Sequence, residues 1–118
     1  MKTSSIYDKH RAAFSRVTAA ALVKNGNQVG TIAFKYPADG AGRLYCYLHI
    51  HGEEMVRGSA SGYGYDKAGA AFESAVSAAI ANPYNSLCRC LLEGCDNIGG
   101  DSWNGALRKA GIDVFMAI

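Results

Sequence analysis

The chain has 118 residues, 49% of them hydrophobic, and its formal net charge at pH 7 is only +2. These values are typical of one soluble domain, and they exclude a protein coated with positive charge. No apolar run approaches the roughly 20 residues that a membrane helix needs, and residues 1–10 have no apolar segment typical of a secretory signal. We expect a single domain over residues 1–118 that is cytoplasmic and has no membrane partner.

Small side chains and unevenly placed charges distinguish this composition. The chain has 19 alanines and 14 glycines, so large apolar residues are few. Residues 1–36 hold six basic groups and one acidic group, whereas residues 37–118 hold six basic and nine acidic groups. This asymmetry predicts a dipolar surface that steers a charged partner. The alternative is that the solvent-exposed ends of strands simply tend to carry Lys and Arg.

A β-hairpin is predicted around Asn25-Gly26, because both positions of its two-residue turn need a positive φ. In the expected register, Leu22 faces Val29 and Ala20 faces Thr31. One face of the hairpin is then apolar, with Val17, Ala19, Ala21, Val23, Ile32 and Phe34. The opposite face carries Arg16, Thr18, Lys24, Thr31 and Lys35.

Two further strands are expected at residues 44–50 and, more weakly, at residues 54–60. The first alternates strictly, since the even positions from Leu44 to Ile50 are apolar or cysteine and the odd positions are Tyr or His. Short turns join all four strands, which favours an antiparallel meander. A last alternating segment at residues 112–118 predicts a strand that joins the same sheet.

Helices are expected at residues 66–81, 84–93 and 103–110, with a weaker signal for a short helix at residues 5–14. Asp66 can cap the first of these, Asp101-Ser102 can cap the third, and Asn82-Pro83 ends the first. The apolar stripe of the longest helix is mostly alanine, which allows close approach to the sheet. The predicted fold is α+β, an antiparallel sheet of four to five strands with helices packed on one face.

The outward face of the third strand is the candidate site. Rings on a flat sheet surrounded by cations suit base stacking with phosphate contact, and they equally suit a protein interface. The plainer alternative is that Tyr and His are good strand formers on a half-exposed face. We predict that the partner-binding residues are Tyr45, Tyr47, His49 and His51, with Arg16, Lys35 and Arg43 adding charge.

Metal and catalytic sites are disfavoured by residue spacing. His49 and His51 with Glu53 and Glu54 resemble the first motif of a cupin, but the spacing is too short and no later His follows. A loose group of three cysteines, Cys88, Cys90 and Cys95, does not match paired zinc-ligand spacing, and Cys46 is expected in the core. The glycines at 62 and 64 precede a helix without the Lys-Ser/Thr of a P-loop. We predict no catalytic residues, no metal site and no cofactor.

Two segments resemble parts of other proteins. The segment Gly62-Tyr-Gly-Tyr-Asp-Lys67, which leads into an alanine-rich helix, resembles a segment of small proteins carried by phages, prophages and plasmids. The tail from Ser102 to Phe115 is similar to the tails of such proteins. Some proteins of these elements are anti-defence factors, including anti-CRISPR proteins, which usually bind a nuclease complex rather than catalyse a reaction.

The sequence therefore predicts a small, non-enzymatic binding protein of a mobile genetic element. Its expected partner is a host protein or nucleoprotein complex, such as a CRISPR effector, which it binds through the open sheet face. The alternative is a single-domain nucleic-acid-binding protein that uses the same face. A zinc-binding module is the third and least favoured hypothesis.

Overall fold

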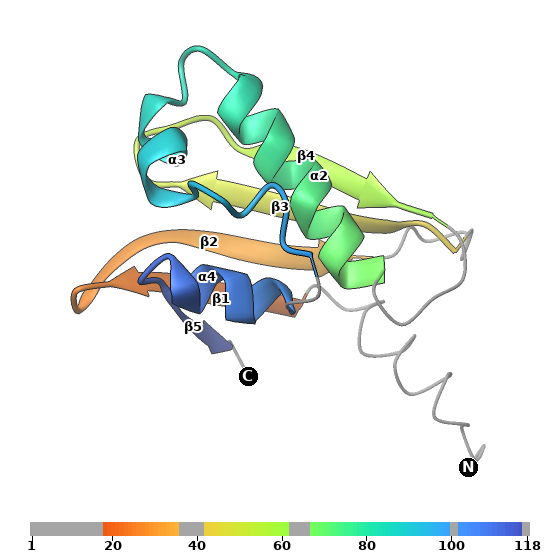
Figure 1. The fold of residues 1–118 in the computed structure, drawn as a ribbon, viewed down its shortest axis with the longest axis horizontal. Coiled ribbons are helices and arrows are strands. Elements are labelled where there is room, and N and C mark those ends of the chain that lie inside the picture. The colour runs from red at the N-terminus through yellow and green to blue at the C-terminus, as the bar shows by residue number, and fades with distance from the viewer. Residues whose placement is uncertain (1–17, 36–41, 62–66, 100–101, 117–118) are drawn as a thin grey trace.

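The protein folds into a five-stranded sheet with three helices in the part of the chain that the computed structural model describes, residues 18–35, 42–61, 67–99 and 102–116 (Figure 1). The strands run in the order β4-β3-β2-β1-β5, and all four neighbouring pairs are antiparallel. In chain order the elements are β1 (Thr18–Lys24), β2 (Asn27–Lys35), β3 (Leu44–Ile50), β4 (Val56–Ala60), α2 (Lys67–Ala81), α3 (Ser86–Leu91), α4 (Trp103–Lys109) and β5 (Asp113–Met116).

The α+β class and the meander with an added C-terminal strand are confirmed. The strand expected at residues 54–60 is shorter, and the helix expected at 84–93 keeps six residues. Ser102 caps α4 as predicted, because its Oγ accepts a hydrogen bond from the Gly105 amide at 3.1 Å. The expected helix at 5–14 and the expected caps Asp66 and Asp101 lie outside the described residues.

The hairpin register differs from the prediction by one residue. The turn is as expected, with φ of 53° at Asn25 and 79° at Gly26, and Lys24 pairs with Asn27. A bulge between Leu22 and Val23 then shifts the pairing, so that Leu22 lies opposite Gly30 instead of Val29. The two-residue turn therefore does not fix the register along the whole of β1.

Because of the bulge, the buried and outward faces of β1 are the reverse of those predicted. Ala20 and Leu22 are buried in the core, at 3% and 0% exposed, whereas Ala19 and Ala21, which we expected inside, lie on the other face. Burial of Leu22 in place of an alanine removes several more methyl and methylene groups from water, each worth about 0.8 kcal/mol. The prediction was wrong because it extended the register of the turn without allowing for this gain.

The core lies between the inward face of the sheet and the helices. Helix α2 lies across β3 and β4 (Figure 1). The Trp103 ring of α4 lies 4.9 Å from the Phe34 ring of β2 and 6.3 Å from the Phe72 ring of α2. These contacts fit the prediction that the helices pack against one face. Near α2, Gly58 of β4 brings the two backbones together, since a Cβ atom there would lie 2.1 Å from the Ala75 amide nitrogen. No helix in the described part of the chain could span a membrane.

Candidate interaction surface

The outward side chains of β3 lie where the sequence predicted them. Burial alternates along the strand, with Leu44, Cys46, Leu48 and Ile50 buried and the residues between them half-buried. Tyr45, Tyr47 and His49 therefore share the face of the sheet opposite to the core. We call this side of the sheet, formed by the outward residues of all five strands, the open face.

The two tyrosines and an arginine form one group on the open face. The ring centroids of Tyr45 and Tyr47 are 6.5 Å apart, and the guanidinium carbon of Arg57 lies 4.8 Å from the Tyr45 ring centroid. This distance is within the range of a cation–π interaction. Arg57 belongs to β4, where it pairs with Tyr47, and it was not among the predicted binding residues. Neighbouring residues of a strand point to opposite faces. Arg57 therefore points outward, because the next residue, Gly58, is buried.

The two histidines differ in their setting. His49 is half-buried within β3 and lies opposite Thr31. His51 follows the strand in an exposed turn, and its backbone amide donates a hydrogen bond to the Val29 carbonyl at 2.9 Å. Their ring centroids are 6.2 Å apart, so the two rings form a second aromatic pair next to the tyrosines.

Only some of the cations predicted for this face are found on it. Lys35 is exposed and pairs with Tyr45, and Arg43 is exposed two residues before Tyr45 on the same chain segment. Lys24 was expected on the open face, but it is in phase with the buried Leu22. Its Cε lies 3.7 Å from where a Cβ of Gly111 would stand, just beyond α4. Arg16 lies outside the described residues.

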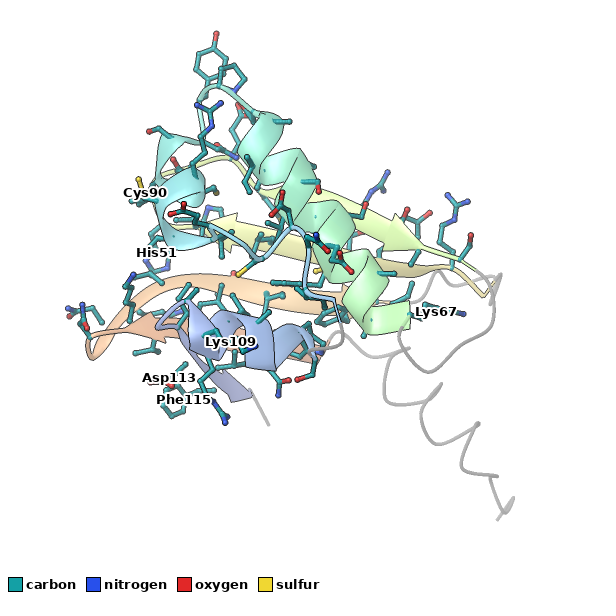
Figure 2. All side chains as sticks on the ribbon, in the orientation of Figure 1. His51, Lys67, Cys90, Lys109, Asp113 and Phe115 are labelled. Atoms are coloured by element: carbon teal, nitrogen blue, oxygen red, sulfur yellow. The ribbon has the colours of Figure 1, made fainter. Side chains whose placement is uncertain are left out.

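The half of the open face formed by β1 and β5 is mostly apolar, with Asp113 of β5 as its one charged residue among those described. The corrected register places Ala21 next to Phe115 of β5 on one side and Thr31 of β2 on the other. Phe115 is 59% exposed, and Figure 2 shows its side chain on β5, at the margin of the sheet. The open face therefore combines a small apolar area with an aromatic and basic area on β3 and β4.

The two carboxylates near the histidines, Glu53 and Glu54, accept hydrogen bonds from backbone amides and from a side-chain amide. The Glu53 carboxylate accepts hydrogen bonds from the amides of Leu87 and Cys88, at 2.7 and 2.9 Å, and so caps the start of α3. Glu54 accepts a hydrogen bond from Asn82 Nδ2 at 3.0 Å. These hydrogen bonds attach the β3–β4 turn to the segment around α3. Among the described residues, no group of three or more ligand-type side chains is arranged to hold a metal.

Asn85 completes this attachment, and its removal is expected to destabilise the fold. The side chain is fully buried, its Oδ1 accepts from the Glu54 amide at 3.1 Å, and its Nδ2 donates to the Glu54 carbonyl at 3.2 Å. The substitution Asn85→Ala leaves both backbone groups without a partner, and we expect the free energy of unfolding to fall by about 2 kcal/mol. Urea denaturation measures this loss.

The matched control is Asn82→Ala, which removes more exposed hydrogen bonds and should cost about 1 kcal/mol or less. Equal losses in the two variants would show that the buried hydrogen bonds between Asn85 and Glu54 stabilise the fold no more than the exposed ones of Asn82.

Three of the four cysteines are buried thiols. Cys46, Cys88 and Cys95 are buried, and burial raises the pKa of Cys46 to about 12. For Cys88, burial, a hydrogen bond with Glu53 and the negative charge of that residue together raise the pKa to about 12. These thiols therefore stay protonated near neutral pH, where a nucleophile or a zinc ligand needs the thiolate. Cys90 alone of the four is exposed.

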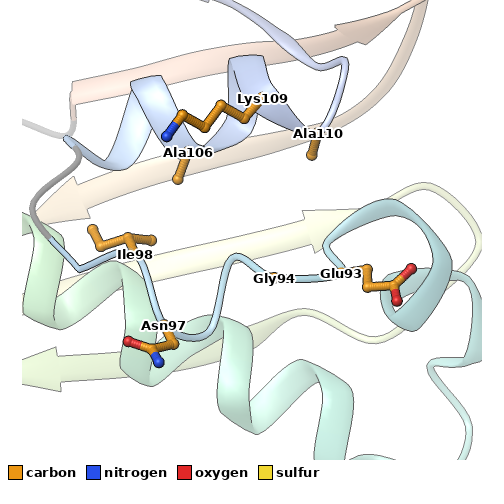
Figure 3. A pocket seen from close by; sticks show the side chains of 7 residues that line it. All are labelled: Glu93, Gly94, Asn97, Ile98, Ala106, Lys109 and Ala110. Atoms are coloured by element: carbon orange, nitrogen blue, oxygen red, sulfur yellow. The ribbon is translucent and has the colours of Figure 1, made fainter.

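A small hollow lies between α4 and the segment that follows α3 (Figure 3). Its volume of about 220 Å³ is below the range of about 300–1,000 Å³ that is usual for small-molecule sites. Glu93 and Lys109 contribute the charged groups of its lining, and Ile98 and Ala106 contribute apolar surface. The hollow has no contact with the tyrosines or histidines of the open face. The glycines at 62 and 64 lie outside the described residues.

Comparisons with family models, with curated proteins and with solved structures found no match to this chain. The open face must therefore be interpreted from its own chemistry.

Proposed function

We propose that this protein is a non-enzymatic binding protein that acts on a protein partner through its open face. The observation that carries the proposal is the composition of this face after correction of the register. Half-buried Tyr45 and Tyr47, the Arg57 guanidinium over a tyrosine ring, and exposed Phe115 lie on one side of one sheet. Tyrosine, arginine and phenylalanine are enriched where protein interfaces gain most of their binding energy.

The same composition makes nucleic acid the second candidate. Binding of a phosphate backbone gains affinity from cations that follow the backbone over many phosphates. On the open face the described cations, Lys35, Arg43 and Arg57, gather at one end, and Lys24 lies on the helix side. The area formed by Ala19, Ala21 and Phe115 offers no charge to phosphate, so a protein partner suits the whole face better.

The proposed partner is a host protein or a host nucleoprotein complex, and the proposed role is inhibition of a host-defence system such as a CRISPR effector. Support for this part comes from the resemblance of Gly62–Lys67 and of the C-terminal tail to proteins of phages, prophages and plasmids.

The double substitution Tyr47→Ala with His49→Ala tests the face. Both side chains are only half-buried on the open face, so we expect the variant to fold and to lose at least about tenfold in affinity for the captured host partner. Circular dichroism checks the fold, and the wild type and the variant are compared by capture from host lysate followed by titration of the partner. Tyr84→Ala is the control, because Tyr84 is an aromatic residue that is 82% exposed between α2 and α3.

Unchanged capture by the folded double variant would contradict the proposal. Tight binding of a random oligonucleotide, with an affinity that falls steeply as salt is added, would favour the nucleic-acid alternative. An effect of Tyr84→Ala as large as that of the double variant would instead place the interface at the segment between α2 and α3.

A further inference from the structure

The chemistry of the open face indicates the kind of protein segment that it binds, if the face is the interface proposed above. Three exposed cations surround the tyrosine pair, on three different segments. Lys35 pairs with Tyr45, Arg57 pairs with Tyr47 and lies over the Tyr45 ring, and Arg43 precedes β3 with the same outward phase as Tyr45. We call Lys35, Arg43, Arg57 and the two tyrosines the basic corner.

The acidic side chains of the described residues lie away from the basic corner. Asp113 is the one on the open face, and it pairs with Val23 next to the β1–β2 turn, whereas Lys35 ends β2 at the opposite end of the sheet. The others lie in the β3–β4 turn, on α2 and after α3, and they are Glu53, Glu54, Glu73, Glu93 and Asp96. Among the described residues, the basic corner therefore carries positive charge that complements an anionic partner.

The remainder of the face sets the shape of that partner. Between the ring of Phe115 on β5 and the rings on β3, the central outward positions of β1 and β2 are small, namely Ala19, Ala21, Thr31 and Ala33. From β5 to β3 is three strand spacings, or about 14 Å. A helix with its side chains is about 10–12 Å across, so one helix fits between the Phe115 ring and the rings on β3.

We propose that the open face receives an acidic amphipathic α-helix of the protein partner. Its apolar side lies on the small residues of β1 and β2 and against Phe115, and carboxylates along one flank meet Lys35, Arg43 and Arg57. This inference rests on the proposed function and specifies the partner's chemistry.

A synthetic amphipathic helical peptide, with leucine and alanine on one side and glutamate along the flank, is the probe. We expect saturable binding with NMR shift changes at Tyr45, Ala21 and Arg57, and a dissociation constant that rises at least about tenfold in Arg57→Glu. Arg57 is exposed on an edge strand, so this variant should fold. The milder Arg57→Gln should give a smaller loss in the same direction.

Arg108→Glu is the matched control, because it makes the same change in net charge at an exposed position of α4. Its affinity for the peptide should equal that of the wild type. The same peptide with lysine in place of glutamate should bind at least about tenfold more weakly than the glutamate peptide.

Three results would overturn the inference. They are no saturable binding of the glutamate peptide, equal binding of the lysine peptide, or an equal effect of Arg57→Glu and Arg108→Glu. If Tyr47→Ala with His49→Ala abolishes capture of the host partner while Arg57→Glu does not, the open face is an interface but the acidic helix is wrong. If neither variant affects capture, the proposed function itself fails.

Discussion

Replacing Gly58 with alanine is expected to lower the free energy of unfolding by about 3 kcal/mol or more. A Cβ at this position would lie 2.1 Å from the Ala75 amide nitrogen and 2.6 Å from the Ala75 Cα. These are backbone atoms of α2, so the clash can be relieved only if the helix moves away from β4. Because α2 contacts β4 and β3 extensively, such a movement also loosens the core beneath it. Urea denaturation of the wild type and the variant measures the difference.

Gly52→Ala is the control for adding a methyl group to a glycine. Gly52 has open space around it, but its φ is +84°, so alanine should cost about 1 kcal/mol through backbone strain alone. A loss at Gly58 no larger than the loss at Gly52 would mean that α2 is not held against β4 as described.

Truncation of Phe72 to alanine is expected to cost about 3–5 kcal/mol, which is the usual range for a large aromatic side chain in a core. Phe72 is fully buried on α2, and its ring lies 6.3 Å from that of Trp103 on α4. Its removal leaves a cavity where the two helices and the sheet meet. Since a small domain is stable by only about 5–15 kcal/mol, we expect a large fall in the thermal midpoint.

The same substitution at Phe115 provides the comparison. Phe115 is 59% exposed on β5, so Phe115→Ala should change the free energy of unfolding by about 0.5 kcal/mol or less. A large loss there would show that the outward side of β5 is covered, and it would contradict the open face on which both proposals rest.

The large losses of stability expected for substitutions at Gly58 and Phe72 follow from how this chain forms its core. Alanines supply much of the buried face of α2, namely Ala71, Ala75 and Ala79. The helix is therefore stabilised by close approach of its backbone to the sheet and less by large side chains. Few bulky residues are available, and each of them therefore carries a large share of the apolar burial. The tyrosines and Phe115 on the open face are bulky residues that the core does not use.

Local patterns in the sequence determined the fold class and much of the candidate site. Strict alternation from Leu44 to Ile50 was sufficient to place the tyrosines and His49 outward, because side chains on a strand point to opposite faces in turn. The turn at Asn25-Gly26 and the cap at Ser102 depend on residues within three positions of each other, so they too could be predicted.

Features that depend on distant residues could be decided only by the tertiary structure. The buried face of β1 depends on whether Leu22 or the neighbouring alanines meet the helices, and the register shift between Leu22 and Val23 allows Leu22 to be buried. The position of Arg57 over Tyr45 likewise requires the pairing of β4 with β3. A pattern of alternation fixes which residues share a face, but it does not say which face is buried when both are made of small apolar side chains.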